Sequence, residues 1–448
     1  MTQLSEHPSV RRFRERTEGL VAGPPPILNA RDLRQICLEA GADDVGFVDL
    51  DRPQLAEQKA DILQFFPHTK SLISFVLRMN REPIHNPARS VANVEFHQTG
   101  ERVNETAHGI VATLEQRGIR AINPAMGFPM EMAQSGKGKI WIVSHKPVAV
   151  AAGLGHMGIH RNVIHPKFGN FILLGTVLLD AVVKEYQQPL DYNPCVECKL
   201  CVSACPVGAI ESDGAFNFST CYTHNYREFI GGFTNWVEQI ADSQSASDYR
   251  RRVTDAESAS MWQSLSFGAN YKSAYCMAVC PAGDDVIAPF LTSRSDYLKD
   301  VVRPLQEKEE TVYVVAGSDA EDYVARRFPH KNTKRVGNSL NRVRSIPAFL
   351  NGLPLTFQRN RSKGLDATYH FTFTGAEERL STIIIRDQKL EVKEGHVGNS
   401  DLKITAESGT WLGFVAKERN LIWALVRRKI RIKGSPRLLL AFGRCFPS

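Results

Sequence analysis

The feature that most constrains this chain is a run of four cysteines that ends at a proline. The run is Cys195-Val-Glu-Cys198-Lys-Leu-Cys201-Val-Ser-Ala-Cys205-Pro206. In the matching C-x2-C-x2-C-x3-C-P spacing, three cysteines bind irons of one iron–sulfur cube and the fourth serves a second cube. Zinc is the alternative, but zinc ribbons use two well-separated cysteine pairs and do not require the proline. The spacing therefore predicts a fold built around iron–sulfur clusters.

A second cysteine group repeats the end of this run. Cys221 is followed much later by Cys276-Met-Ala-Val-Cys280-Pro281. The crossed pattern of paired clusters predicts two ligand sets that share no residue. The first set contains Cys195, Cys198, Cys201 and Cys280. The second set is one thiolate short and contains Cys205, Cys221 and Cys276.

The missing ligand of the second set leaves two assignments open. Ser273 occupies the position where a ferredoxin-type run has another cysteine. The second cluster is therefore either a three-iron centre or a cube with a non-cysteine ligand, taken from Ser273, Tyr275 or His224. Cys37 and Cys445 lie far from both groups in sequence, and we interpret each as a small buried or surface residue rather than a ligand.

Length and composition limit the class of protein. With 448 residues the chain is long enough for two or three domains, and no apolar run approaches the length of about 18 residues that spans a bilayer. Arg11-Arg12 is a possible start of a twin-arginine signal, but Glu15 and Glu18 interrupt the apolar stretch that such a signal needs. Seven of the nine cysteines have cluster spacing, which favours metal over disulfides. We therefore expect no export signal and a cytoplasmic location.

The formal net charge of +7 is modest, and basic residues gather near the C-terminus, over residues 427–433. The alternation of Lys429-Ile-Arg-Ile-Lys433 is typical of a strand whose charges lie on the outer side of a sheet. A solvated face is the interpretation that we favour, followed by contact with an anionic membrane. No aromatic stacking pattern accompanies these charges, so we expect no nucleic acid.

Residues 29–186 have an α/β pattern after a polar and proline-rich segment, which we predict to be a flexible arm over residues 1–28. Helical periodicity predicts helices over 32–40 and 101–117, which end at Gly41 and Gly118. Alternating or compact apolar runs predict strands at the following ranges: 44–49, 71–77, 119–122 and 168–180.

A glycine-rich segment over residues 144–158 is the candidate cofactor loop. Its glycines allow the backbone to approach a flat or anionic group closely, whereas the alternative is a tight turn in a packed core. The G-x-G-x-x-G match is weak as a dinucleotide fingerprint, because no clear strand–turn–helix unit surrounds it. Nearby His145, His156 and His160 are either structural or face the cofactor. The candidate cofactor-binding residues are His145, Gly153, Leu154, Gly155, His156 and Gly158.

The order of these motifs resembles the family of epoxyqueuosine reductases and reductive dehalogenases. The resemblance covers about residues 30–290 and includes His145-Lys-Pro, the glycine segment, Phe168-Gly-Asn, the strand that ends at Asp180, and both cysteine groups. It implies a corrinoid (cobalamin) in an α/β domain similar to the flavin nitroreductases. It also implies two [4Fe–4S] clusters beside the corrinoid and a ferredoxin or flavodoxin as electron donor.

Three departures from this family bear on the function. The family has a catalytic aspartate about eight residues before the proline that matches Pro147, and here that place is near Lys139. Ser273 replaces a cluster cysteine, and the region between Cys221 and Cys276 is longer. We therefore assign no catalytic residue and do not expect reduction of a tRNA base. A flavin or an empty pocket in the α/β domain remains open.

The last hundred residues resemble the sterol carrier protein type 2 domain, over about residues 340–445. Alternating segments predict an antiparallel sheet, with strands at 368–374, 381–385, 390–393 and 401–405. Helices are expected at 410–416 and 421–426, before the apolar stretch 438–442. The resemblance implies helices over a five-stranded sheet with a lipid tail between the two layers. The alternative is an ordinary α+β core that is closed.

Together these patterns predict an α/β nitroreductase-like corrinoid domain, a ferredoxin-like dicluster insert and a C-terminal α+β lipid-carrier-like domain. The predicted divisions are 1–28, 29–186, 187–292, 293–338 (a connector) and 339–448. The expected function is that of an oxidoreductase acting on a hydrophobic or lipid-like substrate, with peripheral membrane contact. The alternatives are a non-catalytic electron-transfer or lipid-binding adaptor, and a flavin-dependent reductase on the same fold.

Overall fold

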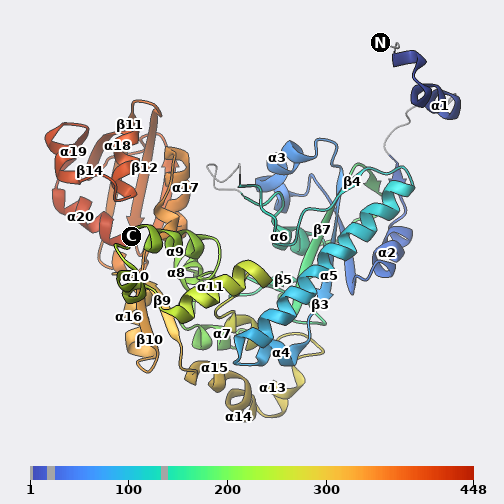
Figure 1. The fold of residues 1–448 in the computed structure, drawn as a ribbon, viewed down its shortest axis with the longest axis horizontal. Helices are drawn as coiled ribbons and strands as arrows, with labels where there is room; N and C mark the ends of the chain where they lie inside the picture. Colours follow the sequence, from blue (N-terminus) through green and yellow to red (C-terminus); the bar gives the residue numbers. More distant parts are fainter. Residues whose placement is uncertain (1–3, 18–25, 133–139, 448) are drawn as a thin grey trace.

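The computed structural model describes residues 4–17, 26–132 and 140–447 (Figure 1). An α/β unit, a helical region that contains the cysteines, and a C-terminal unit with its own sheet follow one another along the chain. None of the helices in the described ranges is long and apolar enough to cross a membrane.

The α/β unit contains a four-stranded antiparallel sheet in the order β2-β3-β7-β4. The strands are β2 (Asp44–Asp49), β3 (Ser71–Arg78), β7 (Ile172–Leu179) and β4 (Ala121–Ile122). β3 and β7 lie inside the sheet and pair over their full lengths, from Ser71 opposite Leu179 to Arg78 opposite Ile172. The compact apolar runs that predicted these two strands reflect burial on both faces. All four predicted strands are present.

Helices cover both faces of this sheet. The long helix α5 (Arg89–Gln116) packs Val103, Ile110 and Leu114 against one face, next to α2 (Ala30–Glu39). α3 (Ala56–Phe65) and α6 (His145–Ala151) pack on the other face. The predicted helix over 101–117 therefore begins earlier, at Arg89, because its first part packs against the cysteine region rather than the sheet.

The N-terminal segment differs from the predicted flexible arm. Residues Pro8–Thr17 form the helix α1 after the turn η1 (Leu4–Glu6), and Figure 1 shows α1 apart from the rest of the molecule. At the other end of the expected arm, β1 (Ile27–Leu28) pairs in parallel with β8 (Val182–Val183). Two short strands, β5 (His156–Met157) and β6 (Val163–Ile164), form a separate hairpin.

The cysteine region is helical, and its short helices position the thiols. They are α7 (Leu200–Ala204), α8 (Phe218–Asn225) and α12 (Tyr275–Ala278). The long interval between α8 and α12 contains α9 (Gly231–Ala241), α10 (Ala246–Arg252) and α11 (Asp255–Phe267). After α12 come α13 (Ala288–Thr292), α14 (Arg294–Tyr297), a π-helical turn (Leu298–Val302) and α15 (Arg303–Glu307).

A small parallel pair of strands connects this region to the C-terminal unit. β9 (Thr311–Val315) pairs with β10 (Asn332–Val336), and α16 (Asp319–Arg327) lies between them in sequence. The predicted connector over residues 293–338 therefore contains regular structure, including β10. Most side chains of β10 are polar and not buried, so the strand has no apolar pattern to reveal it.

The C-terminal unit has a five-stranded sheet in the order β13-β12-β11-β14-β15. The strands are β11 (Ala367–Thr374), β12 (Arg379–Arg386), β13 (Lys389–Glu394), β14 (Leu402–Glu407) and β15 (Ile430–Gly434). β11 and β14 are parallel, which corrects the expectation of an antiparallel sheet. The loop after β13 crosses β11, where His396 stacks on His370, and returns the chain to the start of β11.

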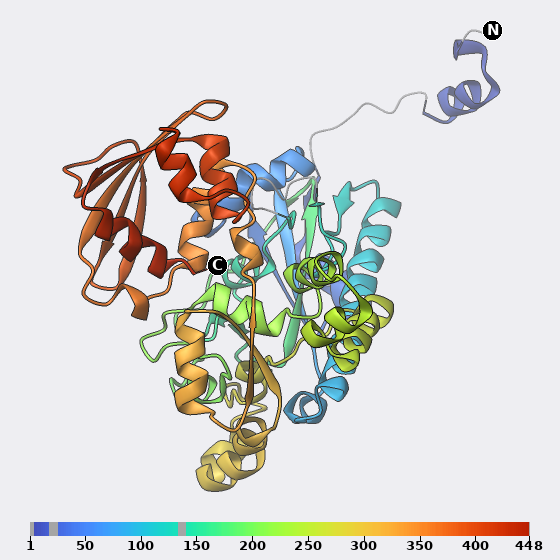
Figure 2. The same cartoon turned by 60° about the vertical axis from the view of Figure 1, so that its left-hand side comes forward.

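Helices α17 (Ile346–Thr356), α18 (Ser408–Val415), α19 (Leu421–Val426) and α20 (Pro436–Cys445) pack on this sheet (Figures 1 and 2). Trp411 is 1% exposed, and its ring lies 5.2 Å from that of Phe371. Tyr369 and Phe442 are in similar contact, at 5.1 Å. The helices therefore pack directly on the strands around these rings, as expected for the closed α+β core. A lipid tail could enter there only if the helices moved away from the sheet.

Candidate functional site

The first cysteine set occupies a loop that the backbone folds tightly around it. Glu197 and Lys199 adopt positive φ angles of 49° and 58°, which turn the chain between Cys195, Cys198 and the start of α7. Asn193 accepts a hydrogen bond from the backbone N–H of Cys195 at 2.9 Å and fixes the entry to the loop. Such turns allow closely spaced cysteines to point to one centre.

The four thiols of this set lie close together. Burial raises the pKa of Cys201, and the neighbouring thiols add to the effect; they are Cys276, Cys280, Cys198 and Cys195. Burial likewise raises the pKa of Cys280 to about 12, with further contributions from Cys198 and Cys195. Cys280 also packs in one cluster with Cys195, so the fold brings Cys280 to the first loop from a distant part of the chain, as the crossed pattern expects.

The second set is also assembled in space. Burial raises the pKa of Cys221 well above its usual value, and the thiols of Cys205 and Cys276 raise it further. Helix α8 positions Cys221 and begins at Asn217, whose side chain accepts a hydrogen bond from the N–H of Thr220. The N–H of Ala209 donates to the sulfur of Cys205 at 3.3 Å. The role of these seven cysteines as ligands remains a prediction.

The spacing of the thiols bears on the zinc alternative. Within the described residues, no group of three or more His, Cys, Asp or Glu side chains converges closely enough for a single metal ion. A zinc site needs its thiolates about 2.3 Å from one ion, whereas a cube places each thiolate on a different iron. Cys37 and Cys445 are fully buried elsewhere, in agreement with packed residues.

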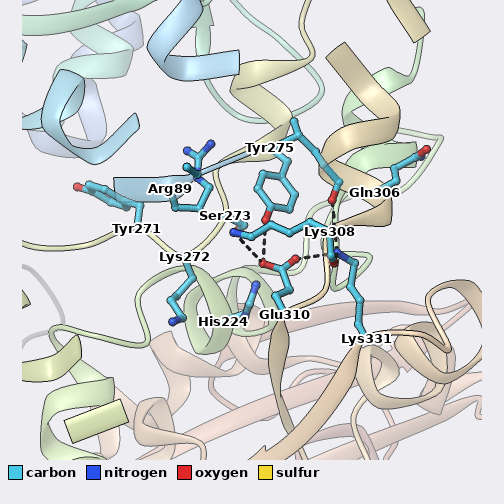
Figure 3. Close-up of polar contacts among 12 residues, drawn as sticks. Arg89, His224, Tyr271, Lys272, Ser273, Tyr275, Gln306, Lys308, Glu310 and Lys331 are labelled. Carbon is cyan, nitrogen blue, oxygen red and sulfur yellow. Dashed lines mark hydrogen bonds and ion pairs between the residues drawn. The ribbon is translucent and has the colours of Figure 1, made fainter. Parts of the chain in front are cut away.

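The three proposed non-cysteine ligands are engaged with other partners, and Figure 3 shows the bond of Tyr275 to Glu310. The hydroxyl of Ser273 donates to Asn225 Oδ1 at 3.1 Å. The hydroxyl of Tyr275 donates to Glu310 Oε2 at 2.8 Å. His224 Nδ1 accepts a hydrogen bond of 3.4 Å from the backbone N–H of Tyr313, and its Nε2 has no partner in the described residues. None of these bonds involves a thiol of the second set.

Glu310 is the centre of a buried ionic network below α12 (Figure 3). The Lys331 ammonium, whose side chain is fully buried, donates to Glu310 Oε1 at 2.8 Å and to the Lys308 carbonyl at 2.7 Å. Burial alone would raise the pKa of Glu310, but the charges of His224, Lys331 and Lys308 outweigh it and lower the pKa. The pKa of His224 itself is lowered to about 4 by burial, so at neutral pH the two lysines provide this stabilisation. The network fixes Tyr275, and thereby the backbone that leads to Cys276.

Arg89 reaches the same region from the first turn of α5. Its guanidinium lies 5.5 Å above the centre of the Tyr275 ring and is buried. Nη1 makes only long hydrogen bonds, to the carbonyls of Ile84 and Asn86, and Nε and Nη2 have no partner in the described residues. Burial lowers the pKa of Arg89, while Tyr275, Glu310 and Cys276 oppose the shift. A buried guanidinium, two of whose nitrogens have no hydrogen-bond partner in the described residues, therefore lies close to the three-thiol set.

A cavity of about 690 Å³ lies between the α/β unit and the cysteine region. Its walls come from residues 140–147, from β7 and from helices α8 and α12. The polar side chains on these walls include His145, Lys146, Asn162, Asn170, Tyr222 and Tyr226. Cavities of this size bind cofactors and other ligands of moderate size.

Lys146 connects the cavity to the second cysteine set. Its ammonium donates to the Arg161 carbonyl at 2.6 Å and to Asn162 Oδ1 at 3.0 Å. The surrounding protein lowers the pKa of Lys146 by burial, while Cys276 and Cys221 oppose the shift. Burial also raises the pKa of Tyr226, and Cys221 adds to this effect. Both side chains therefore lie between the cavity and the three thiols.

Of the predicted cofactor-binding residues, only His145 lines the cavity. Its Nδ1 lies 2.8 Å from Thr176 Oγ1, its Nε2 lies 3.1 Å from the Ala125 carbonyl, and burial lowers its pKa. The other five predicted residues do not line the cavity; they are Gly153, Leu154, Gly155, His156 and Gly158.

The structure gives the glycines a packing reason instead. A Cβ atom on Gly153 would lie 2.5 Å from the Gln188 carbonyl oxygen, and one on Gly155 would lie 2.5 Å from that of Ile164. A Cβ atom on Gly158 would collide with the ring of His160. The alternative of a tight turn in a packed core therefore describes this segment better. Sequence reasoning missed Lys146 and Tyr226, although the adjacent His145-Lys-Pro motif pointed to the first.

The place of the family's catalytic aspartate, near Lys139, lies outside the described residues. The exposed side chains closest to it in sequence are Met132 and Trp141, and the Trp141 indole donates to the Gly127 carbonyl at 2.9 Å.

Comparisons with known proteins agree with both predicted resemblances. The model of the SCP-2 sterol transfer family matches residues 353–447, and that of the 4Fe-4S binding domain matches residues 189–211. The epoxyqueuosine reductase of Staphylococcus aureus is 36% identical over 80 residues, which are 18% of this chain and 20% of that protein. The enzyme of Aliivibrio fischeri is 24% identical over 170 residues, 36% of this chain and 41% of that protein. The chain thus spans less than half the length of these relatives.

Solved structures give weaker likenesses. The epoxyqueuosine reductase of Streptococcus thermophilus has a TM-score of 0.33 and 16% identity, over 61% of this chain and 75% of that chain. An epoxyqueuosine reductase with an epoxyqueuosine-modified tRNA stem loop has a TM-score of 0.35 and 15% identity, over 72% and 80%. A reductive dehalogenase described with B12-dependent dehalogenation has a TM-score of 0.38 and 16% identity, over 64% and 36%. The tRNA stem loop is said of that relative alone, and the expectation that no nucleic acid binds to this chain stays a prediction.

Proposed function

We propose that this relative of the epoxyqueuosine reductases is a corrinoid-dependent iron–sulfur reductase. The observation that carries the proposal is the cavity, because it borders the three-thiol set through Lys146 and Tyr226. A cofactor in this cavity would lie next to the second cluster. We retain 29–186, 187–292 and 339–448 as the proposed domains.

The residues of the cavity fit a large macrocycle with polar edges. Ile172, Leu173 and Leu174 on β7 provide an apolar wall for a flat ring. Asn170 Oδ1 is buried without a partner in the described residues, and it would accept a hydrogen bond from an amide group of the ligand. Lys146 and Asn162 add polar groups at the rim. A corrinoid held here would supply low-valent cobalt for cleavage of a carbon–oxygen or carbon–halogen bond.

The two cysteine sets suggest an electron route that ends at this cavity. Tyr192 and Val196 beside the first set are exposed, so a ferredoxin or flavodoxin can approach that set from solvent. Cys201 of the first set and Cys276 of the second lie close enough to influence each other's charge. Electrons would therefore enter at the four-thiol cluster, pass to the three-thiol cluster, and reach the cavity beside Lys146.

We propose a hydrophobic substrate, because the C-terminal unit is attached to the cysteine region. Arg359 forms ion pairs with Glu211 at 2.9 Å and with Asp213 at 2.6 Å. The Asn217 amide, at the start of α8, donates to the Phe357 carbonyl at 3.4 Å. These contacts place a lipid-carrier-like unit next to the helix that bears Cys221.

Anaerobic purification tests the proposal, with iron, cobalt and flavin quantified together. We expect about seven to eight irons per chain by the two-cluster pattern, and a changed visible spectrum on addition of cobalamin. Asn170→Leu should weaken this spectral change by about tenfold in affinity, since it removes the unpartnered acceptor, and should leave the iron content unchanged. Tightly bound flavin would favour the flavin reductase, and an unoccupied cavity under saturating cobalamin would favour the electron-transfer adaptor. Parallel titration with an epoxyqueuosine-modified tRNA stem loop would detect the substrate class of the relatives.

A further inference from the structure

The helix α19 has an apolar outer face that none of the described residues covers. Its sequence, Leu-Ile-Trp-Ala-Leu-Val, contains no polar residue. Ala424 is buried, and Leu421 and Leu425 pack against the C-terminal core. On the other side, Ile422, Trp423 and Val426 are 70%, 62% and 66% exposed. A helix that is apolar on all sides is normally buried, so half of α19 lacks a partner.

Basic residues surround this face. Arg427 and Arg428 directly follow α19 and are exposed, and the Arg427 guanidinium lies 5.7 Å from the centre of the Trp423 ring. Every charged residue between 419 and 447 is basic. The nearest preceding carboxylates are Glu407 and Glu418; Glu407 accepts hydrogen bonds from Thr410 and lies 3.7 Å from the Lys429 ammonium. Figure 1 shows α19 at the outer edge of the C-terminal unit, away from the α/β unit.

We propose that the α19 tip, defined as Ile422, Trp423, Val426, Arg427 and Arg428, docks on the surface of an anionic lipid bilayer. Tryptophan favours the interface between headgroups and acyl chains, and aliphatic residues beside it enter the acyl region. Arginines next to such a segment add attraction to anionic headgroups. The aliphatic part distinguishes a bilayer from a nucleic acid, because the phosphate backbone offers no apolar region to Ile422 and Val426.

This docking goes beyond the proposed reductase activity and would bring the lipid-carrier-like unit to a source of apolar molecules. It also refines the sequence-based expectation of membrane contact. That expectation placed the contact on Lys429–Lys433, whereas Arg431 and Lys433 alternate with the core-facing Ile430 and Ile432 on a strand and so point to the opposite side of the sheet from α19.

The test measures binding of the full-length protein to vesicles of phosphatidylcholine, with or without about a third of phosphatidylglycerol. We expect cosedimentation only with the anionic vesicles, a blue shift of the Trp423 emission, and release at high salt. Each basic residue near a membrane surface adds about fivefold in affinity, so Arg427→Glu with Arg428→Glu should weaken binding at least 25-fold. Trp423→Ser and Ile422→Asp should each reduce it about tenfold or more.

Matched variants separate the tip from general effects. Trp262 on α11 is 58% exposed, so Trp262→Ser removes a similar side chain elsewhere and should leave binding unchanged. Arg250→Glu with Arg251→Glu on α10 makes the same change in net charge and should have little effect. Thermal unfolding and iron content should match the unmodified protein in all variants. Equal loss in tip and control variants would overturn the proposal. It would also be overturned if anionic vesicles failed to bind while an RNA stem loop bound through Arg427 and Arg428.

Discussion

The two cysteine sets differ in what surrounds them, although the same short motif generates both. The four-thiol set has exposed neighbours such as Val196. The positive charge of Arg294 acts on this set and opposes the rise in the pKa of Cys198. The three-thiol set has Arg89, Lys146 and Tyr226 around it, and it borders the cavity. In the route that we propose, the complete set would receive electrons at the surface. The incomplete set would deliver them inside the protein, where the charges of Arg89 and Lys146 would adjust its potential.

Removing one cysteine set at a time is the strongest test of the difference between the two sets. Cys198→Ala and Cys221→Ala should each lose about half of the iron, because each serves a different cluster. Cys221→Ala should also abolish reduction of a cofactor bound in the cavity, while a chemical reductant should still reduce the remaining four-thiol cluster. Iron analysis and visible spectra of anaerobically reconstituted protein measure both effects. Complete loss of iron in either variant would mean that the two sets do not form independent clusters.

Acid should destabilise the protein in part through His160, which is buried close to Lys146. Burial, together with a smaller contribution from the charge of Lys146, lowers the pKa of His160 to about 4. Between this value and the usual histidine pKa near 6.5, the unfolded chain binds a proton that the folded protein does not. Above a pH of about 6.5, His160 therefore does not reduce the free energy of unfolding. At a pH of about 5, this free energy is lower by about 2 kcal/mol.

The variant His160→Asn isolates this effect. The side-chain oxygen of asparagine can replace Nδ1, which accepts a hydrogen bond from the backbone N–H of Asn162 at 3.1 Å. Denaturant unfolding of the variant should therefore lose less stability between pH 7.5 and pH 5 than the unmodified protein, by about 2 kcal/mol. Identical pH dependence in both proteins would show that His160 is not the group that titrates.

Arg89 provides the next test, because its buried guanidinium lies near the three-thiol set. Arg89→Gln removes a positive charge that stabilises the reduced cluster, so the reduction potential of that cluster should fall. The expected shift is roughly 50–100 mV, the Coulomb energy of one charge about 10 Å away at an effective dielectric constant near 20. Arg89→Lys keeps the positive charge and should therefore retain most of the original reduction potential. An anaerobic redox titration followed by electron paramagnetic resonance measures this potential.

Arg294 supplies the matched control for the other set. Its charge acts on Cys198 and its side chain lies over the Phe290 ring. Because solvent screens exposed charges, Arg294→Gln should shift the potential of the four-thiol cluster less than Arg89→Gln shifts that of the three-thiol cluster. A larger effect of Arg294 would reverse the comparison.

Sequence patterns anticipated the parts of the fold that rest on strong local signals. The spacing of the cysteines predicted two sets, and the fold brings Cys280 and Cys276 to their expected neighbours. Apolar periodicity predicted β3, β7 and the strands of the C-terminal sheet. β10 escaped detection because it is polar, and α17 escaped because Pro347, Gly352 and Pro354 lie within it.

The cavity could not be predicted, because it forms where distant segments meet. Lys146 follows His145 on α6, whereas Tyr226 ends α8, and nothing in their local sequence indicates that they face one space. For the glycines, the sequence indicated the correct local geometry but the wrong cause. A close backbone approach was inferred correctly, but the approaching group is the protein's own chain, at Gln188 and Ile164. Composition cannot distinguish these two causes of a glycine requirement.

The smallest expected effect concerns Ser273, the residue that makes the two sets unequal. Its N–H and its hydroxyl both donate to Asn225 Oδ1, at 3.0 and 3.1 Å, and the side chain is buried. Ser273→Ala should therefore leave the iron content and the cluster spectrum unchanged and reduce stability by about 1 kcal/mol, the cost of one hydrogen bond. Ser264 is a matched buried serine on α11 that accepts a hydrogen bond of 3.1 Å from the N–H of Asn270. Ser264→Ala should cost a similar amount. If Ser273→Ala alone loses iron, the hydroxyl is the fourth ligand, and the two sets are equivalent in number.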